Sequence, residues 1–322
     1  MRYLILFFLA MTLCMGQMCG QATGGDAAQT TTDGTAGAGS GSQDATTGGT
    51  GSSQQDGAAT GGGGGGSGSA DTGGGGPGGS TTTRGAIVAD HLAAAAFDAV
   101  PITAIQAAQS AYRIWYGHTS HGSQIVTGMQ MIHSADARYA FNAGAGSLSL
   151  QEQTDVDLGY EGNLDWVATT RDVLNTPGNN INLVMWSWCG GVSENTEAGI
   201  AAYLTAMNQL ETDYPNVTFV YMTGHLDGSG PSGNLYLRNE QIRAYCRTHN
   251  KVLYDFADIE SYDPAGNYYP DGTDWCEWCE AWCTTHTCPT CEDCAHSQCM
   301  NCYQKGRAFW WMMARLTGWS GG

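Results

Sequence analysis

The sequence predicts an α/β domain: a three-layer, doubly wound, mostly parallel sheet. Two features of the chain carry this prediction. After residue 108, short runs that are apolar throughout alternate with longer amphipathic segments. Strands that are apolar on both faces are typical of parallel sheets covered by helices on both sides. The segments between the runs are long enough for the helical crossovers that parallel strands need.

Strands are expected where apolar residues run together. Ile114–Tyr116 forms such a run, which ends at Gly117, and residues 181–188 form a longer one. Further strands are expected at 217–222 and 252–256, and a weaker one at 139–142. In a doubly wound sheet the active crevice lies at the carboxyl ends of the strands, so the residues directly after each strand are the first candidates for chemistry.

Helical spacing of apolar residues marks the other elements. Residues 123–132 carry Ile125, Val126, Met129 and Ile132 at this spacing. Helices are also expected at 164–174 and 194–214, which Pro177 and Pro215 end, and at 234–249 and 306–316. The alanine-rich segment 86–108 also has helical spacing and is expected to pack at the domain edge.

Composition divides the chain into three parts. Residues 1–19 combine one positive charge with a short apolar run, which is typical of a signal peptide and too short to span a membrane. Residues 20–84 hold 24 of the 47 glycines and almost no apolar side chain larger than alanine, so a disordered Gly/Ser/Thr-rich linker is expected. Residues 85–322 form one domain. A lipidated Cys19 or Cys14 would anchor the protein at the outer surface of a membrane; simple secretion is the alternative.

The formal net charge of −18 argues against two kinds of partner. An acidic surface repels phosphate backbones and anionic lipid headgroups, and no basic stripe interrupts it. We therefore expect no nucleic-acid binding.

Polar residues follow the first expected strand in a glycine-bounded turn, Gly117-His118-Thr119-Ser120-His121-Gly122. A serine at such a turn can expose its hydroxyl, and the N–H groups at the start of the next helix can face a developing oxyanion. From the local sequence alone, a simple helix cap by Ser120 or Ser123 is favoured.

Other strand ends carry further candidates. Gly190, Gly191 and Asn195 follow the strand at 181–188, where glycines allow close backbone approach to a ligand, although an ordinary loop has the same composition. His225 follows the strand at 217–222 and, like His118, is a candidate substrate contact. Asp293 precedes His296 by three residues before the last helix; an aspartate so placed can orient an imidazole that accepts a serine proton.

Taken together, these features resemble the SGNH (GDSL-like) hydrolases, over roughly Tyr112 to Gly318. In that family the nucleophilic serine follows the first strand, and an Asp-x-x-His precedes the last helix. The resemblance implies a flavodoxin-like fold with Ser120 as nucleophile, His296 as general base and Asp293 as the residue that orients it.

The resemblance also implies an oxyanion hole formed by Ser120, a glycine and an asparagine. Gly162, or else Gly159, and Asn195 are the candidates. The chain departs from the family in these blocks, because Gly117-His118-Thr119-Ser120 replaces Gly-Asp-Ser and no clean Gly-x-Asn-Asp is present. The chain is also similar to a divergent bacterial subgroup of the superfamily, through this same turn, the segment 255–261, and Trp310-Trp311 to Gly318-Trp319.

Eight cysteines crowd into residues 276–302, within the Cys-rich segment 275–302. Four pairs have C-x-x-C spacing, which fits either disulfides or zinc. In an exported protein we expect disulfides, with the pairing left open. Cys189 and Cys246 could form a fifth. Trp275, Trp278 and Trp282 either stack on sugar rings or fill a small core around the disulfides; core filling is slightly favoured.

The resemblance implies a secreted or surface-tethered serine esterase that removes O-acyl groups from carbohydrate. A non-catalytic glycan-binding module on the same fold is the alternative, and a zinc-binding interaction protein is a third. We expect a monomer whose partner is a small-molecule or carbohydrate ester, with no cofactor and no metal.

Overall fold

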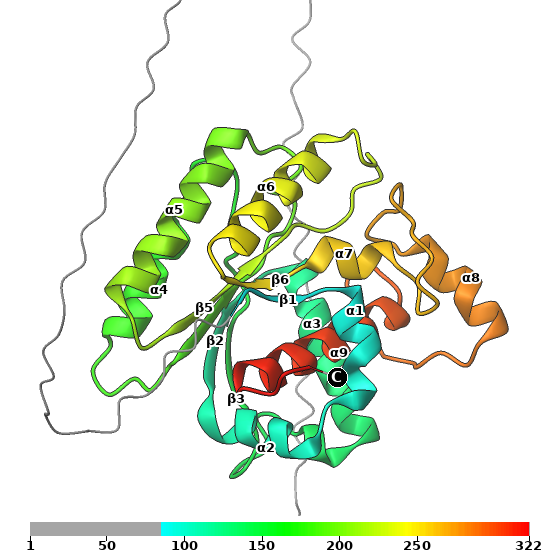
Figure 1. The fold of residues 1–322 in the computed structure, drawn as a ribbon, viewed down its shortest axis with the longest axis horizontal. Helices are drawn as coiled ribbons and strands as arrows, with labels where there is room; N and C mark the ends of the chain where they lie inside the picture. Colours follow the sequence, from blue (N-terminus) through cyan, green and yellow to red (C-terminus); the bar gives the residue numbers. More distant parts are fainter. Residues whose placement is uncertain (1–84, 322) are drawn as a thin grey trace, which may run out of the picture. The chain divides into compact units, whose positions relative to one another are not determined.

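Six strands form one sheet in which every pair of neighbours is parallel (Figure 1). The computed structural model describes residues 85–321; the expected signal peptide 1–19 and linker 20–84 lie outside them. The strands are β1 Ile87–Ala89, β2 Arg113–Gly117, β3 Ser149–Gln153, β4 Leu183–Trp186, β5 Thr218–Met222 and β6 Val252–Tyr254. Their order across the sheet is β1-β6-β5-β4-β2-β3.

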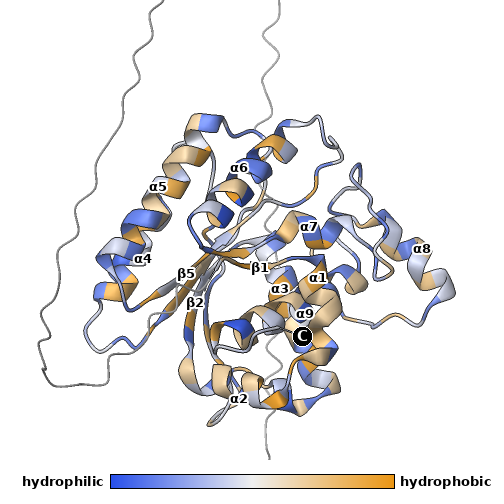
Figure 2. Cartoon of the chain, in the orientation of Figure 1, coloured by the Kyte–Doolittle hydropathy of each residue, from blue (hydrophilic) through white to orange (hydrophobic). Residues whose placement is uncertain are grey.

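Helices cover both faces of the sheet, so the predicted three-layer α/β architecture is confirmed. One layer holds α4 Asp165–Asn175, α5 Glu197–Asp213 and α6 Asn234–Thr248. The other holds α1 His91–Ala95, α2 Ile102–Ala111, α3 Ser120–Ala135, α7 Phe256–Ser261 and α9 Cys299–Leu316. Figure 2 shows apolar residues concentrated along the strands between these layers, as expected for a sheet buried on both faces.

The strand order creates a switch point between β2 and β4. From β2 the chain moves to β3 on one side, then returns to β4 on the other side of β2. The loops that follow β2 and β4 therefore diverge onto opposite faces and leave a crevice at the carboxyl ends of these strands. The loop after β2 leads directly into α3, so the amino end of α3 lies at this crevice.

Helices α3 and α9 touch through their backbones. A Cβ on Gly128 would lie 1.9 Å from the carbonyl oxygen of Cys302, and a Cβ on Gly306 would lie 2.3 Å from the carbonyl carbon of Gly128. No side chain fits at either position without moving one helix. This crossing fixes α3, and with it the residues at the amino end of α3, against the last helix of the domain.

The cysteine segment is cross-linked by four disulfides, which confirms the disulfide interpretation over the zinc one. The pairs are Cys276–Cys279, Cys283–Cys288, Cys291–Cys299 and Cys294–Cys302. The suggested fifth bond does not form, because Cys246 is a buried free thiol in α6. Disulfides at this density are typical of proteins in oxidising, extracytoplasmic compartments.

Edge elements depart from the sequence-based prediction. Residues 139–142 form no strand; a 3₁₀ turn, Ala137–Tyr139, and an isolated bridge between Phe141 and Leu148 stand there. The true edge strand is β3, which was missed because only Leu150 among its residues is buried. At the opposite edge β1 interrupts the alanine-rich segment, and two short helices also escaped prediction: α7, and α8 Glu277–Thr285 within the cysteine segment.

No single helix among residues 85–321 is long and apolar enough to cross a membrane. Within these residues one pair of helices, His91–Ala99 and Ile102–Ala111, bent by 112°, meets the requirements of length and composition together.

Candidate functional site

Ser120 is the first residue of α3 and stands at the switch point. Gly117 ends β2, where a Cβ would lie 2.2 Å from the ring of Trp186, so only glycine fits beside β4. Thr119 is the N-cap residue, but its hydroxyl donates to Asp157 at 2.7 Å and makes no side-chain cap. Ser120 is therefore not the cap that local sequence favoured, and the amino end of α3 carries no side-chain cap within the described part of the chain.

His121 is held in one orientation by contacts at both ring nitrogens. Its Nε2 lies 2.9 Å from Oδ2 of Asp274, and its Nδ1 lies 3.3 Å from Sγ of Cys189. An ionised carboxylate can only accept, so Nε2 carries the proton and Nδ1 carries the lone pair. The hydroxyl of Ser120 lies 3.7 Å from the same sulfur. The serine oxygen and the lone-pair nitrogen thus converge on one atom from the loop after β4.

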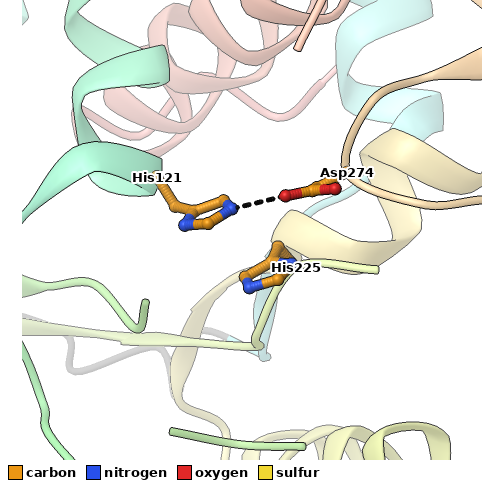
Figure 3. A group of neighbouring side chains, drawn as sticks. All are labelled: His121, His225 and Asp274. Atoms are coloured by element: carbon orange, nitrogen blue, oxygen red, sulfur yellow. Dashed lines mark hydrogen bonds and ion pairs between the residues drawn. The ribbon is translucent and has the colours of Figure 1, made fainter. Parts of the chain in front are cut away.

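Two more imidazoles pack on His121. The ring of His225 stacks on it with centroids 3.7 Å apart, and the ring of His296 lies 4.6 Å away at 17°. Figure 3 shows His121 at the end of α3, His225 on the segment after β5 and Asp274 on the loop that leads into the cysteine segment. The Nδ1 of His225 donates to the carbonyl oxygen of Leu226 at 2.7 Å, which leaves Nε2 as its lone-pair nitrogen.

The close packing of these side chains determines the protonation states of His121 and Asp274. Burial, together with the neighbouring imidazoles, lowers the pKa of His121 to about 4, although the bond to Asp274 opposes the shift. Burial would raise the pKa of Asp274, but the bond from His121 and the three nearby imidazoles hold this pKa below its usual value. At neutral pH the site therefore contains a neutral His121 beside an ionised carboxylate.

A buried ion pair supports the loops that present His225 and His296. Lys305 Nζ lies 2.6 Å from Oε1 of Glu260, and both side chains are fully buried. The other oxygen of Glu260 accepts from the backbone N–H of Leu226 at 2.8 Å. Lys305 also donates to Gln124, whose amide donates to the carbonyl oxygen of Ala295 at 2.5 Å. One network therefore fixes the chain next to each of the two histidines.

The predicted pair Asp293 and His296 is not joined by a hydrogen bond or an ion pair within residues 85–321, and both side chains are exposed. Disulfides at Cys291 and Cys294 fold this loop so that His296 adopts a left-handed φ of 60° and turns its ring toward His121. His296 thus reaches the site, while the aspartate that binds a histidine there is Asp274.

The predicted oxyanion residues lie in different places. Asn195 is buried, and its amide donates to the carbonyl oxygen of Gly191 at 3.1 Å, so it shapes the loop after β4. A Cβ on Gly191 would lie 1.7 Å from the carbonyl oxygen of Gly159, which places these two backbones in contact. Gly162 lies on an exposed turn with open space around it. Among the three predicted donors, only the backbone of Ser120 belongs to the amino end of α3.

Of the remaining candidate residues, some are buried and structural and others are exposed. His118 is only 2% exposed and lies 3.1 Å from Glu152, so it braces the end of β2 and is not accessible to a substrate. Trp278 is buried and donates to the carbonyl oxygen of Glu260, and Trp282 stacks on His286. Trp275 is 52% exposed and follows Asp274 directly in the chain. The core-filling interpretation therefore holds for Trp278, while Trp275 is exposed and its contact with sugar rings stays a prediction.

Sequence reasoning missed His121 and Asp274 as members of the site. The signal for His121 was its place in the first turn of a helix that starts at a strand end, directly after the candidate serine. Asp274 lies more than 150 residues away, in a segment dominated by cysteines, and nothing local distinguishes it. No model of a known protein family and no curated protein matches the chain.

Proposed function

We propose that this protein is an ester hydrolase of the SGNH type in which Ser120 is the nucleophile, His121 the general base and Asp274 the residue that orients the base. One observation carries the proposal. At the switch point of the sheet, the Ser120 hydroxyl and the lone-pair nitrogen of His121 converge on Cys189, while Asp274 holds the opposite nitrogen of the same ring.

The chemistry follows from this arrangement. As the Ser120 oxygen attacks the ester carbonyl carbon, the hydroxyl proton moves to Nδ1 of His121. The carbonyl oxygen becomes an oxyanion, which the N–H groups at the amino end of α3 can stabilise. The imidazolium then gives its proton to the leaving alcohol, and an acyl-enzyme remains. Water hydrolyses the acyl-enzyme by the same transfers in reverse order, while Asp274 stabilises each transient imidazolium.

The stacked rings of His225 and His296 also affect the pKa of the proposed base, His121. They shield His121 from water, and their proximity disfavours a positive charge on it. A base whose pKa is about 4 stays neutral in mildly acidic solution, so turnover should persist below pH 6. His296 as the base is the alternative that the family resemblance implies, although Asp293 makes no hydrogen bond to it within the described residues.

A carbohydrate ester fits the surroundings of the site. Trp275 offers an exposed indole next to Asp274, and aromatic faces of this kind stack on sugar rings. A polar hollow lined by Tyr236, Tyr262, Arg243 and Arg247 also includes Leu226, the neighbour of His225. Hydroxyl and guanidinium groups there would bind sugar hydroxyls. We propose an O-acylated carbohydrate as substrate, met outside the cytoplasm by a secreted or surface-tethered protein.

The test is hydrolysis of p-nitrophenyl acetate by the purified, disulfide-intact chain. Ser120→Ala should lower kcat/KM by roughly 10³-fold or more, whereas the matched control Ser123→Ala, in the same turn of α3, should retain activity. His121→Gln should match the loss in Ser120→Ala if His121 is the base. A large loss in His296→Gln with an active His121→Gln would transfer the base to His296. Equal activity of Ser120→Ala and wild type would overturn the proposal.

A further inference from the structure

We propose that His121, His225 and Asp274 form a binding site for one divalent transition-metal ion, with zinc preferred. Each residue offers one ligand atom, and the three atoms all lie within 4.8 Å of one another (Figure 3). The zinc alternative considered from the sequence concerned the cysteines; these three residues lie on segments far apart in the chain and form no motif. The site is tested by binding itself, so it does not depend on the esterase proposal.

Metal binding at this site requires the His225 ring to reorient. Donor atoms around a tetrahedral zinc ion lie roughly 3.3–3.5 Å apart, given bonds of about 2.0–2.2 Å. Nε2 of His121 and Oδ2 of Asp274 are already 2.9 Å apart. The third donor is Nε2 of His225, since its Nδ1 donates to Leu226. The rings of His121 and His225 are stacked in parallel, 3.7 Å apart at 2°, so the His225 ring must tilt until the lone pair of its Nε2 faces the ion; the three donors would then occupy three corners of a tetrahedron.

The chemistry of the donors selects the ion. Two imidazoles and one carboxylate are a common ligand set of zinc, and imidazole nitrogen is a poor ligand for magnesium or calcium. The bond to Leu226 fixes the ring of His225, as outer hydrogen bonds do for metal-bound histidines. The ring of His296 stacks on that of His121 at 4.6 Å but is not one of the three residues whose donor atoms lie within 4.8 Å of one another, so it contributes no ligand as placed.

The backbone conformation of His296 also supports the proposed site. A histidine in the left-handed region is strained, and such strain is retained where the surrounding structure enforces it. Here two disulfides and the bond from Gln124 to Ala295 enforce it. The result is a third imidazole beside two others in a cluster that has one carboxylate. A metal ion bound there would neutralise the charge of that carboxylate.

Metal binding would change the role of His121 in hydrolysis. A metal on Nε2 takes the place of the proton there, so the neutral ring carries its proton on Nδ1 instead. Nδ1 can then no longer accept a proton from Ser120. If the proposed esterase mechanism holds, zinc will inhibit it reversibly; if the mechanism fails, zinc binding is unaffected.

The experiment is a titration of the full, disulfide-intact chain, freed of any polyhistidine tag and treated with chelator, with ZnCl₂ in a calorimeter. We expect one zinc ion per chain and no heat with MgCl₂ or CaCl₂. CoCl₂ should produce visible d–d absorption that added ZnCl₂ removes. His225→Gln and Asp274→Asn should each weaken zinc binding by at least about 100-fold, because even loss of an outer partner costs 10- to 100-fold.

The matched control is His249→Gln, which changes the exposed C-cap residue of α6, outside the three proposed ligands, and should bind zinc as the wild type does. Circular dichroism of each variant separates loss of the site from loss of the fold. Absence of zinc binding by the folded wild type would overturn the proposal. So would equal zinc affinity in the wild type and in folded His225→Gln and Asp274→Asn.

Discussion

Acid should destabilise this domain specifically through His121. The folded-state pKa of His121 is about 4, whereas an unfolded histidine titrates near 6.5. Between these two values the unfolded chain binds a proton that the folded chain does not. The free energy of unfolding must therefore fall as the pH decreases below 6.5, and the loss is complete near pH 4.

The size of the loss follows from the pKa. A difference of one pH unit corresponds to about 1.4 kcal/mol, so lowering the pKa from 6.5 to about 4 is worth roughly 3 kcal/mol. A typical domain is stable by about 5–15 kcal/mol, so this one side chain would account for a large share of the acid sensitivity. Because His121 is buried, solvent screens its interactions little.

The assay is urea denaturation followed by tryptophan fluorescence at pH 7 and at pH 4. Other groups also titrate in this interval, so the informative quantity is a difference between variants. The free energy of unfolding of the wild type should fall by roughly 3 kcal/mol more than that of His121→Gln. His249→Gln, which changes an exposed histidine, should behave as the wild type. Equal losses in the wild type and His121→Gln would refute the reasoning.

Four further predictions concern the helices, ion pair and disulfides that support the site, and the exposed Trp275 beside it. Gly128→Ala should destabilise the fold by about 1–3 kcal/mol in urea denaturation because its Cβ would meet the backbone of α9, whereas Gly190→Ala, where space is open, should change stability little. Lys305→Met should cost about 3–5 kcal/mol because Glu260 remains buried and unpaired, and the double variant Lys305→Met with Glu260→Gln should recover part of this loss. Reduction of the four disulfides should abolish ester turnover before circular dichroism shows loss of the sheet; simultaneous loss would show that they support the whole domain. Trp275→Ala should raise KM for an acetylated oligosaccharide by about 2- to 10-fold and leave KM for a small aliphatic acetate unchanged.

The sheet core was predictable because its signal is local. β2, β4 and β5 are runs of apolar residues with both faces buried, and the helices after them show regular spacing. The edge strands gave no such signal. β3 is mostly polar because one of its sides has no neighbouring strand, and β1 is only three residues long. Burial, which makes a strand recognisable, is lower at the edges of a sheet.

The site was predictable only where topology determines it. Ser120 follows a buried strand and precedes a helix, so its place at the crevice could be inferred from the element order alone. Asp274 could not be inferred, since it reaches His121 through the folding of the cross-linked segment. The spacing of Asp293 and His296 suggested a pair, but the disulfides at Cys291 and Cys294 set the loop geometry instead.

Covalent labelling tests the central claim most directly. A fluorophosphonate forms a stable phosphonate ester with a serine whose hydroxyl is activated by a base. Incubation of the intact protein, followed by proteolysis and mass spectrometry, should place one label on Ser120. The label should be absent from Ser120→Ala and form much more slowly in His121→Gln and Asp274→Asn. Labelling of another residue, or no labelling of a correctly folded wild-type protein, would contradict the account.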